Sequence, residues 1–439
     1  MQQRYIASWD SIRTHQVPAW YHDCKLGIFI HWGLYSVPAF APMTGELGTV
    51  EMDERWFCNN PYAEWYFNSI NVKKGPSYEY HLKKYGADFK YEDFTSLWKA
   101  QQWDPKAWAK LFKEAGAGYV VLTSKHHDGY CLFDSQYTDY SAAVSGPKRD
   151  IVGELSDAVR NEGMKMGLYY SGMIDWHFYP VPQYIQSELI GCPTFEYADY
   201  AFKQSKELID KYHPSVFWND IGWPYVGEPQ LPYLLAYYYN VCQDGVVDDR
   251  FNGLHCDFTT KEYQTGTMDR EKKWEMCRGL GLSFGYNGAE DESYVLSAGR
   301  LIGLLAETVA NNGNLLINIG PKADGTIPEI QVQRLKDLGA WLKINGEAIY
   351  GTRCSERTSI VSDSLAVHFT SKDGSLYAIA DGKQDGGFSF AVDNVSAAPV
   401  PLDARTDYEW QRSGDRVVIN IRNYTENDGA VVFKFENQK

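Results

Sequence analysis

The chain has 439 residues, of which 44% are hydrophobic and 23% are charged, a composition that is ordinary for a globular protein. Its length suits one large α/β barrel with a smaller domain, or two to three average domains. The formal net charge of −15 argues against binding to nucleic acid and to anionic membrane surfaces, because both repel an acidic protein. A neutral partner is expected instead.

The eight cysteines are scattered without a C-x-x-C pair, which fits neither a disulfide scaffold nor a structural zinc site. Residues 1–15 lack the apolar segment of a signal peptide, and no stretch approaches the roughly 18 apolar residues of a membrane span. We therefore expect a cytoplasmic protein, or a secreted or periplasmic one if a signal peptide has been removed.

Short apolar runs recur along the chain with helical segments between them, which is typical of parallel strands buried on both faces. About eight such units predict a (β/α)8 barrel, and their irregular spacing indicates long insertions or missing helices. The clear runs are residues 27–31, 119–123, 166–170, 215–218 and 315–319, and weaker ones lie near Arg250, Thr259 and Ser283.

Two helices are well marked. Asp104 is a good N-cap, Pro105 suits the first helical position, and Gly116 ends the periodic segment. Residues 328–345 show helical spacing of leucines and are followed by Gly346. This second helix closes the predicted barrel domain, residues 1–350.

The pattern changes after Gly351, where apolar residues alternate with others at 365–370 and again at 431–435. Asp-Gly at 373–374 and Ser-Gly at 413–414 indicate hairpin turns. Residues 351–439 are therefore predicted to form a small antiparallel β-sandwich, which packs against the barrel without supplying catalytic residues.

Polar side chains follow several predicted strands at the point where each strand ends. Because the carboxyl ends of barrel strands meet at one face, these side chains predict a site there. A carboxylate, Asp220, directly follows a short buried strand and is walled by Trp218 and Trp223. The other polar or aromatic residues in such positions are His31, His126, His127, Asp128, Tyr169, Tyr170, Asp175 and His177.

Three kinds of chemistry fit these residues. The histidines and Asp175 could hold zinc, but the chain has no H-E-x-x-H and no H-x-H on its first predicted strand. Residues 281–285 match G-x-S-x-G, but a loop follows them where a nucleophile elbow needs a helix. Paired carboxylates for glycosyl transfer fit better, with Asp220 ionised and a second, protonated carboxyl near the leaving oxygen. Glu262, Glu275 and Asp257 are the candidates for that second group.

Several segments together resemble a known family. They are KLGIFIHWG at 25–33, EWY at 64–66, KHHDG at 125–129, FWND at 217–220 and KKWEMC at 272–277. In this order, from Trp20 to Gly351, they resemble the α-L-fucosidases of glycoside hydrolase family 29, in their broad-specificity bacterial branch. The order of H-W-G, K-H-H-D-G and W-x-D is far more specific than any one motif.

The resemblance implies a metal-free retaining exo-α-L-fucosidase without a cofactor, built on a barrel with a C-terminal β-sandwich. Asp220 matches the nucleophile that forms a covalent fucosyl-enzyme, and Glu262 matches the general acid/base, with Glu275 as competitor. Lys261 stands where the family pattern usually has proline. We further expect Arg250 and nearby donors to hold Asp220 ionised, and a less polar environment to raise the pKa of Glu262.

The sugar-binding residues are carried over in the same way. Those expected to bind the fucose hydroxyls are His31, Glu64, Trp65, His126 and His127. Tyr169 and Phe284 are expected to line the ring and its methyl group, with Arg250 beside the carboxylates, and Trp218 is expected to bind the substrate as well. The expected partner is an α-L-fucosylated oligosaccharide or glycoconjugate, with transfucosylation as a side reaction. The alternative is a catalytically silent fucose-binding protein, and linkage preference and homo-oligomer formation stay open.

Overall fold

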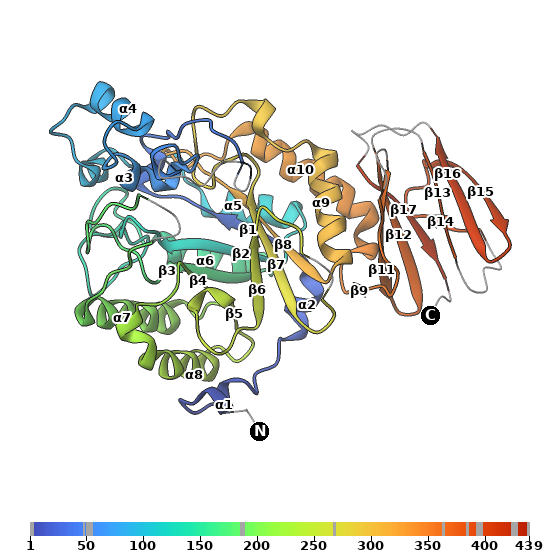
Figure 1. Cartoon of the computed structure of the whole chain (residues 1–439), viewed down its shortest axis with the longest axis horizontal. Helices are drawn as coiled ribbons and strands as arrows, with labels where there is room; N and C mark the ends of the chain where they lie inside the picture. The colour runs from blue at the N-terminus through green and yellow to red at the C-terminus, as the bar shows by residue number, and fades with distance from the viewer. Residues whose placement is uncertain are drawn as a thin grey trace.

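A computed structural model describes residues 4–46, 49, 56–184, 189–266, 269–361, 365–382, 386–391, 398–422 and 429–436. Figure 1 shows a barrel of strands surrounded by helices, with a group of antiparallel strands beside it. This arrangement confirms the predicted fold class. No helix among the described residues is long and apolar enough to cross a membrane.

Eight parallel strands form the barrel in the order β5-β4-β3-β2-β1-β8-β7-β6. Since β5 and β6 stand at the two ends of this order, the barrel is nearly closed rather than complete. The strands are β1 (Leu26–Ile30), β2 (Tyr119–Lys125), β3 (Lys165–Ser171), β4 (Val216–Asp220), β5 (Val246–Val247), β6 (Phe258–Glu262), β7 (Lys273–Gly279) and β8 (Gly313–Ile319).

Two of the weaker strand predictions are wrong, because the strands lie at neighbouring positions of the chain. The run near Arg250 is the 3₁₀ helix η7 (Asp249–Phe251), and β5 lies just before it. The run near Ser283 is a loop, and the true strand is β7. All seven residues of β7 are buried although three of them carry charge, so an apolar pattern could not reveal the strand.

The helices lie mostly between the strands, with long non-helical insertions at several connections. The α-helices are α1 (Trp9–Ile12), α2 (Ala19–Cys24), α3 (Tyr66–Ser69), α4 (Pro76–Tyr85), α5 (Pro105–Glu114), α6 (Ile151–Asn161), α7 (Phe195–Tyr212), α8 (Leu231–Val241), α9 (Ala298–Ala310) and α10 (Glu329–Asn345). The other 3₁₀ helices are η1 (Leu34–Ser36), η2 (Trp56–Cys58), η3 (Ala63–Trp65), η4 (Tyr91–Ser96), η6 (Tyr225–Gln230), η8 (Glu292–Tyr294) and η9 (Gly346–Ala348).

Both marked helices are confirmed. Helix α5 follows Asp104, whose carboxylate accepts hydrogen bonds from the backbone N–H groups of Lys106 and Ala107. Helix α10 ends at the predicted Asn345. Among the described residues, no α-helix lies between β5 and β6 or between β6 and β7, which confirms the predicted irregularity of the barrel.

The C-terminal strands form two facing sheets. One has the order β10-β11-β12-β17-β14 with β9 added beside β11, and the other is β13-β16-β15. Apolar residues of both sheets, such as Phe369 and Phe390, pack in a core between them. The strands are β9 (Arg353–Cys354), β10 (Ile360–Val361), β11 (Leu365–Lys372), β12 (Ser375–Gly382), β13 (Gly386–Ala391), β14 (Val400–Pro401), β15 (Asp407–Ser413), β16 (Arg416–Arg422) and β17 (Val431–Phe435).

The outer face of the larger sheet packs on the barrel helices, and Figure 1 shows α9 and α10 beside it. Trp341 of α10 donates its indole N–H to the carbonyl of Ala430 at 2.7 Å. Thr370 of β11 is fully buried there and donates to Ala348 at 2.7 Å. The alternation at 365–370 therefore marks two buried faces rather than one.

The hairpin turn at 373–374 is confirmed. The second turn lies one residue later than predicted, at 414–415, since Ser413 pairs with Arg416. The division of the chain into domains at residue 350 stays a prediction.

The barrel interior depends on a close approach at Gly27 of β1. A Cβ atom added there would lie 2.4 Å from the ring of Tyr119 on the neighbouring strand. The tyrosine hydroxyl donates a hydrogen bond to Glu275 of β7 across the interior. The glycine of the K-L-G-I-F-I-H motif therefore makes room for an aromatic ring.

We expect Gly27→Ala to destabilise the protein by about 1–3 kcal/mol, because the added methyl group overpacks a closed core. Urea denaturation followed by tryptophan fluorescence measures this change. Gly288→Ala is the matched control, since the nearest atom to its added Cβ is 3.3 Å away. Equal stability of the two variants would contradict the packing argument.

Candidate active site

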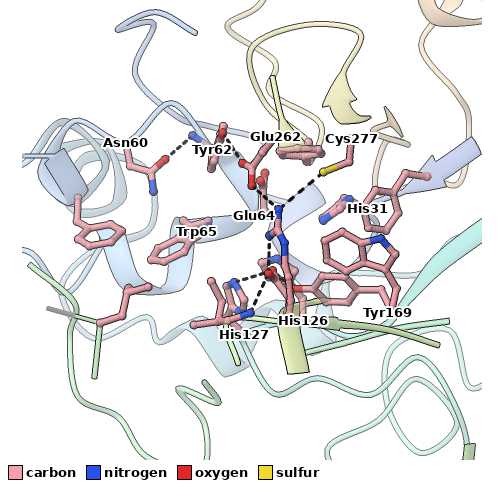
Figure 2. Close-up of a pocket in the computed structure, with 18 of the residues that line it drawn as sticks. His31, Asn60, Tyr62, Glu64, Trp65, His126, His127, Tyr169, Glu262 and Cys277 are labelled. Atoms are coloured by element: carbon pink, nitrogen blue, oxygen red, sulfur yellow. Dashed lines mark hydrogen bonds and ion pairs between the residues drawn. The ribbon is translucent and has the colours of Figure 1, made fainter. Parts of the chain in front are cut away.

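One pocket at the carboxyl ends of the barrel strands contains all eleven site residues that the sequence analysis selected (Figure 2). Figure 2 shows Glu262 and Tyr62 on one side of it and His126 and His127 on the opposite side. The eleven are His31, Glu64, Trp65, His126, His127, Tyr169, Trp218, Asp220, Arg250, Glu262 and Phe284.

Strand ends supply most of these side chains. Asp220 is the last residue of β4 and Glu262 is the last of β6. His31 directly follows β1, and Arg250 comes from η7 in the segment between β5 and β6. Glu64 and Trp65 come from η3 in the long insertion after β1. The carboxyl ends of parallel strands meet at one face of a barrel, which brings these distant segments together.

Arg250 connects the two carboxylates. Its Nη1 donates to Asp220 Oδ1 at 2.7 Å, and its Nη2 donates to Glu262 Oε2 at 3.1 Å. The guanidinium group also lies 4.7 Å above the ring of Trp218. Because Arg is planar and carries N–H groups on several edges, one side chain holds two carboxylates in a fixed relation.

Asp220 is held in its ionised form. Burial raises the pKa of this carboxyl, but the charge of Arg250 and hydrogen bonds from Arg250 and Tyr169 outweigh burial, so the pKa falls below its ordinary value. Tyr169 donates to Asp220 Oδ2 at 2.8 Å, and the backbone N–H of Ile221 donates to Oδ1 at 2.9 Å. The carboxylate is therefore fixed in orientation as well as in charge.

The setting of Glu262 is polar, so the expectation of a less polar environment is wrong. Besides Arg250, the hydroxyl of Tyr62 donates to Glu262 Oε1 at 2.9 Å. About a quarter of the side chain is open, with 23% exposed. Glu262 thus reaches the open part of the pocket, whereas Asp220 is almost covered at 11%.

The two rival carboxylates lie elsewhere. Glu275 is fully buried in the barrel interior, where Tyr21, Tyr119 and Trp218 donate to it and burial raises its pKa to about 7. Asp257 pairs with His15 at 2.8 Å and binds Tyr239 at 2.7 Å, outside the pocket. Of the three candidates, only Glu262 shares the pocket with Asp220.

The pocket histidines are neutral at pH 7. Burial lowers the pKa of His31 to about 3 and that of His127 to about 4, and it also lowers the pKa of His126. A neutral imidazole offers one donor and one acceptor, which is useful for binding hydroxyl groups. These rings therefore suit a polar uncharged ligand.

Glu64 is buried beside the histidines, and burial raises its pKa to about 7. Its Oε2 accepts a hydrogen bond from the backbone N–H of Gly285 at 2.7 Å and from the hydroxyl of Ser283 at 3.1 Å. The serine of the G-x-S-x-G match therefore holds Glu64 in place. It lies in a loop without the helix of a nucleophile elbow, which excludes the serine-hydrolase reading of this motif.

The metal reading receives no support from the geometry. Asp175 pairs with buried Lys125 at 3.0 Å, and His177 faces Glu92 at 3.4 Å, so neither lines the pocket. Within the described part of the chain, a group with metal-ligand spacing is His15, His255 and Asp257, away from the pocket.

Aromatic rings form the walls. Trp65 stacks on Phe57 with ring centroids 4.7 Å apart, and Tyr169 stacks on Trp218 at 5.6 Å. Sequence reasoning missed a group of lining residues that lie in loops or next to selected positions. They are Phe29, Trp56, Phe57, Asn60, Tyr62, Leu189, Ile221 and Cys277. Cys277 could have been found, since it follows Glu275 by two positions on one strand and so shares its face.

A barrel whose carboxyl-end pocket joins two carboxylates through an arginine, among neutral histidines and aromatic walls, defines a glycoside hydrolase. The family model for Alpha-L-fucosidase matches residues 1–347. The Alpha-L-fucosidase of Dictyostelium discoideum is 36% identical over 412 residues, which cover 90% of this chain and 84% of that protein.

Solved structures of α-L-fucosidases are also similar to this chain over nearly its whole length. A Thermotoga maritima alpha-L-fucosynthase, in complex with alpha-L-Fuc-(1-2)-beta-L-Fuc-N3, is 45% identical with a TM-score of 0.90, over 99% of this chain and 100% of that one. A Thermotoga maritima alpha-fucosidase in complex with fucose is 43% identical with a TM-score of 0.87, over 98% and 100%. The chain belongs to the α-L-fucosidase family, and it is an exo-α-L-fucosidase.

Glu262→Gln and Glu275→Gln separate the two glutamates. If Glu262 is the general acid/base that the family resemblance implies, Glu262→Gln should lower activity on sugar-linked fucosides by about 10²–10⁴-fold, since the amide gives no proton to the leaving oxygen. The same variant should lose far less activity on an aryl fucoside, because a good leaving group needs little protonation in the first step. Glu275→Gln should keep kcat/KM close to the wild-type value but cost about 1–3 kcal/mol of stability, because the amide N–H₂ meets donors. The opposite pattern would assign the acid/base role to Glu275.

Proposed function

We propose that the enzyme hydrolyses α-L-fucosides with retention of anomeric configuration, using Asp220 as nucleophile and Glu262 as general acid/base. The observation that carries this assignment is the Arg250 bridge. It joins one almost covered carboxylate to one that reaches the open part of the pocket. Retaining glycosidases need two such carboxyl groups on opposite sides of the scissile bond.

In the first step, an Asp220 oxygen attacks the anomeric carbon while the bond to the leaving oxygen breaks. Glu262 gives its proton to that oxygen, and a fucosyl ester of Asp220 remains. In the second step, Glu262 takes a proton from water, the water oxygen bonds to the anomeric carbon, and the Asp220 carboxylate leaves. A sugar hydroxyl in place of water completes a transfucosylation.

The charge arrangement supports this division of roles. Arg250 and Tyr169 hold Asp220 ionised before the attack and receive it as a carboxylate when it leaves. Arg250 also pairs with Glu262 after the proton is given away, when that group becomes a carboxylate. The polar contacts are made in the free enzyme, so little reorganisation is needed during the reaction.

Fucose is proposed to bind through the neutral imidazoles of His31, His126 and His127, with Glu64 and Trp65 beside them. Buried polar groups of this kind reject epimers that lack the matching hydroxyl, because the groups would be left unpaired. Phe284 contacts Phe29 and His31 and offers an apolar wall for the methyl group. The fucosylated substrate is an oligosaccharide or glycoconjugate whose remaining part faces the open side.

A catalytically silent fucose-binding protein is the alternative use of this pocket. The presence of both carboxylates argues against it, since binding alone needs no ionised group next to the anomeric carbon. Hydrolysis of an aryl α-L-fucoside by the purified chain decides between the two. Comparing that rate with rates on α1,2-, α1,3-, α1,4- and α1,6-linked oligosaccharides gives the linkage preference.

Asp220→Ala should lower kcat/KM on an aryl fucoside by about 10³-fold or more, since the covalent step is lost. Azide should restore part of the activity by attacking from the vacated side, which yields the β-azide of fucose. Proton NMR of the product identifies the anomer. The α-azide would instead assign Asp220 as the acid/base.

Arg250→Met should move the acid limb of the kcat/KM profile to higher pH. The guanidinium charge lowers the pKa of Asp220, so its removal lets Asp220 take up a proton at higher pH and activity is lost there. Arg250→Lys is the control, because it keeps a charge but cannot contact both carboxylates in the same way. An acid limb unchanged in Arg250→Met would contradict the assignment.

A further inference from the structure

We propose that Asn318 and Ser171 are positioning residues that fix His31 and His127 as hydrogen-bond acceptors toward the sugar. Two hydroxyl groups of the substrate must then bind as donors. The inference rests on the proposed function for the identity of the ligand, but the proton positions follow from contacts of the free protein. Neither residue lines the pocket, so each acts through a histidine.

The proton position on His31 follows from a chain of contacts that starts at a backbone carbonyl. The carbonyl of Phe284 can only accept, and Asn318 Nδ2 donates to it at 2.6 Å. The amide oxygen of Asn318 therefore points the other way, toward His31 Nδ1 at 2.7 Å. An amide oxygen only accepts, so His31 Nδ1 carries the proton.

His31 then has no second proton to offer. Burial lowers its pKa to about 3, so the ring is neutral at pH 7 and its single proton is on Nδ1. The other nitrogen, Nε2, is an acceptor, and no hydrogen bond from a described residue occupies it. His31 lines the pocket, so this lone pair is available to a ligand hydroxyl.

The proton position on His127 follows from its contact with Ser171. The hydroxyl of Ser171 donates its one proton to the carbonyl of Ile174 at 2.6 Å. Its oxygen can therefore only accept from His127 Nδ1, which lies 2.6 Å away. Burial lowers the pKa of His127 to about 4, which leaves Nε2 as an acceptor.

The surroundings of His127 show where the donating hydroxyl would lie. Nε2 lies 3.7 Å from Asp220 Oδ2, and both atoms are acceptors. Two acceptors facing each other repel, and an O–H donor placed beside them relieves this. A sugar hydroxyl that donates to Nε2 would therefore be bound next to the attacking carboxylate.

His126 supplies an internal comparison. Its Nδ1 is buried and has no hydrogen-bond partner, so the described protein does not fix its tautomer. Its ring lies 4.1 Å from that of His127 and 5.5 Å from that of His31. His126 can therefore adopt the tautomer that the substrate requires, while its two neighbours cannot.

Long-range ¹H–¹⁵N NMR of the full chain with ¹⁵N-labelled histidine tests the proton positions without substrate. We expect His31 and His127 to show a protonated Nδ1 and an unprotonated Nε2 at pH 7, with signals assigned by their loss in His31→Gln and His127→Gln. A protonated Nε2 on either ring would overturn the proposal for that ring. An inactive protein with the expected tautomers would contradict the proposed function alone.

Ser171→Ala tests the positioning role directly. Without the acceptor, the His127 signals should show a mixture of tautomers or a protonated Nε2, while the His126 signals should stay unchanged. KM for an aryl fucoside should rise at least about tenfold with a smaller change in kcat, because the lost contact acts in ground and transition states alike. An unchanged Nδ1-protonated His127 in this variant would overturn the role of Ser171.

Ser171→Thr keeps the hydroxyl and should restore both the tautomer and KM. Asn318→Leu is the corresponding change beside His31, and its NMR signature should appear on His31 alone. If Asn318→Leu does not fold, the wild-type spectrum still decides the His31 tautomer. Restored KM without a restored tautomer in Ser171→Thr would contradict the mechanism.

Discussion

The site depends on one guanidinium group that holds two carboxylates together. Without it, Asp220 and Glu262 would be like charges at the ends of β4 and β6, and mutual repulsion would favour protonation of one of them. Arg250 is itself held by Thr260, whose hydroxyl accepts from its Nε at 2.9 Å, and Thr260 donates in turn to Asp249 at 2.9 Å. Arg250 and Glu262 thus both come from the open side of the barrel, where β5 and β6 do not pair.

The barrel interior next to Arg250 and the two carboxylates is also polar. Trp218 contacts Arg250 with its ring face while its indole N–H donates to Glu275 at 3.0 Å. Tyr21 donates to the same carboxyl at 2.9 Å, so a buried acid connects several strands across the interior. Because hydrogen bonds from Tyr21, Tyr119 and Trp218 satisfy the carboxyl group of Glu275, no unpaired charge is buried there. The network instead fixes the orientation of Trp218. An apolar core would pack there without fixing the indole in one orientation.

Apolar runs were sufficient to predict five barrel strands, because these strands are buried on both faces. The same rule failed at β7, where Lys273, Glu275 and Arg278 are buried by specific partners that no local pattern shows. Asp220, the three histidines and Tyr169 could be predicted from their places at strand ends. The family resemblance was needed to choose Glu262 among three carboxylates and to find Glu64, Trp65, Arg250 and Phe284. Tyr62 could not be found either way, since its contact with Glu262 joins residues 200 positions apart through a loop.

The K-H-H-D-G segment shows why a motif is more specific than the chemistry of its site requires. Only His126 and His127 line the pocket. Lys125 pairs with Asp175, Asp128 accepts from Tyr91, and the backbone carbonyl of His127 accepts from Trp176. A Cβ on Gly129 would lie 2.3 Å from Asp175. The other three residues therefore anchor the turn that carries the two histidines, and their contacts fix where that turn lies in the barrel.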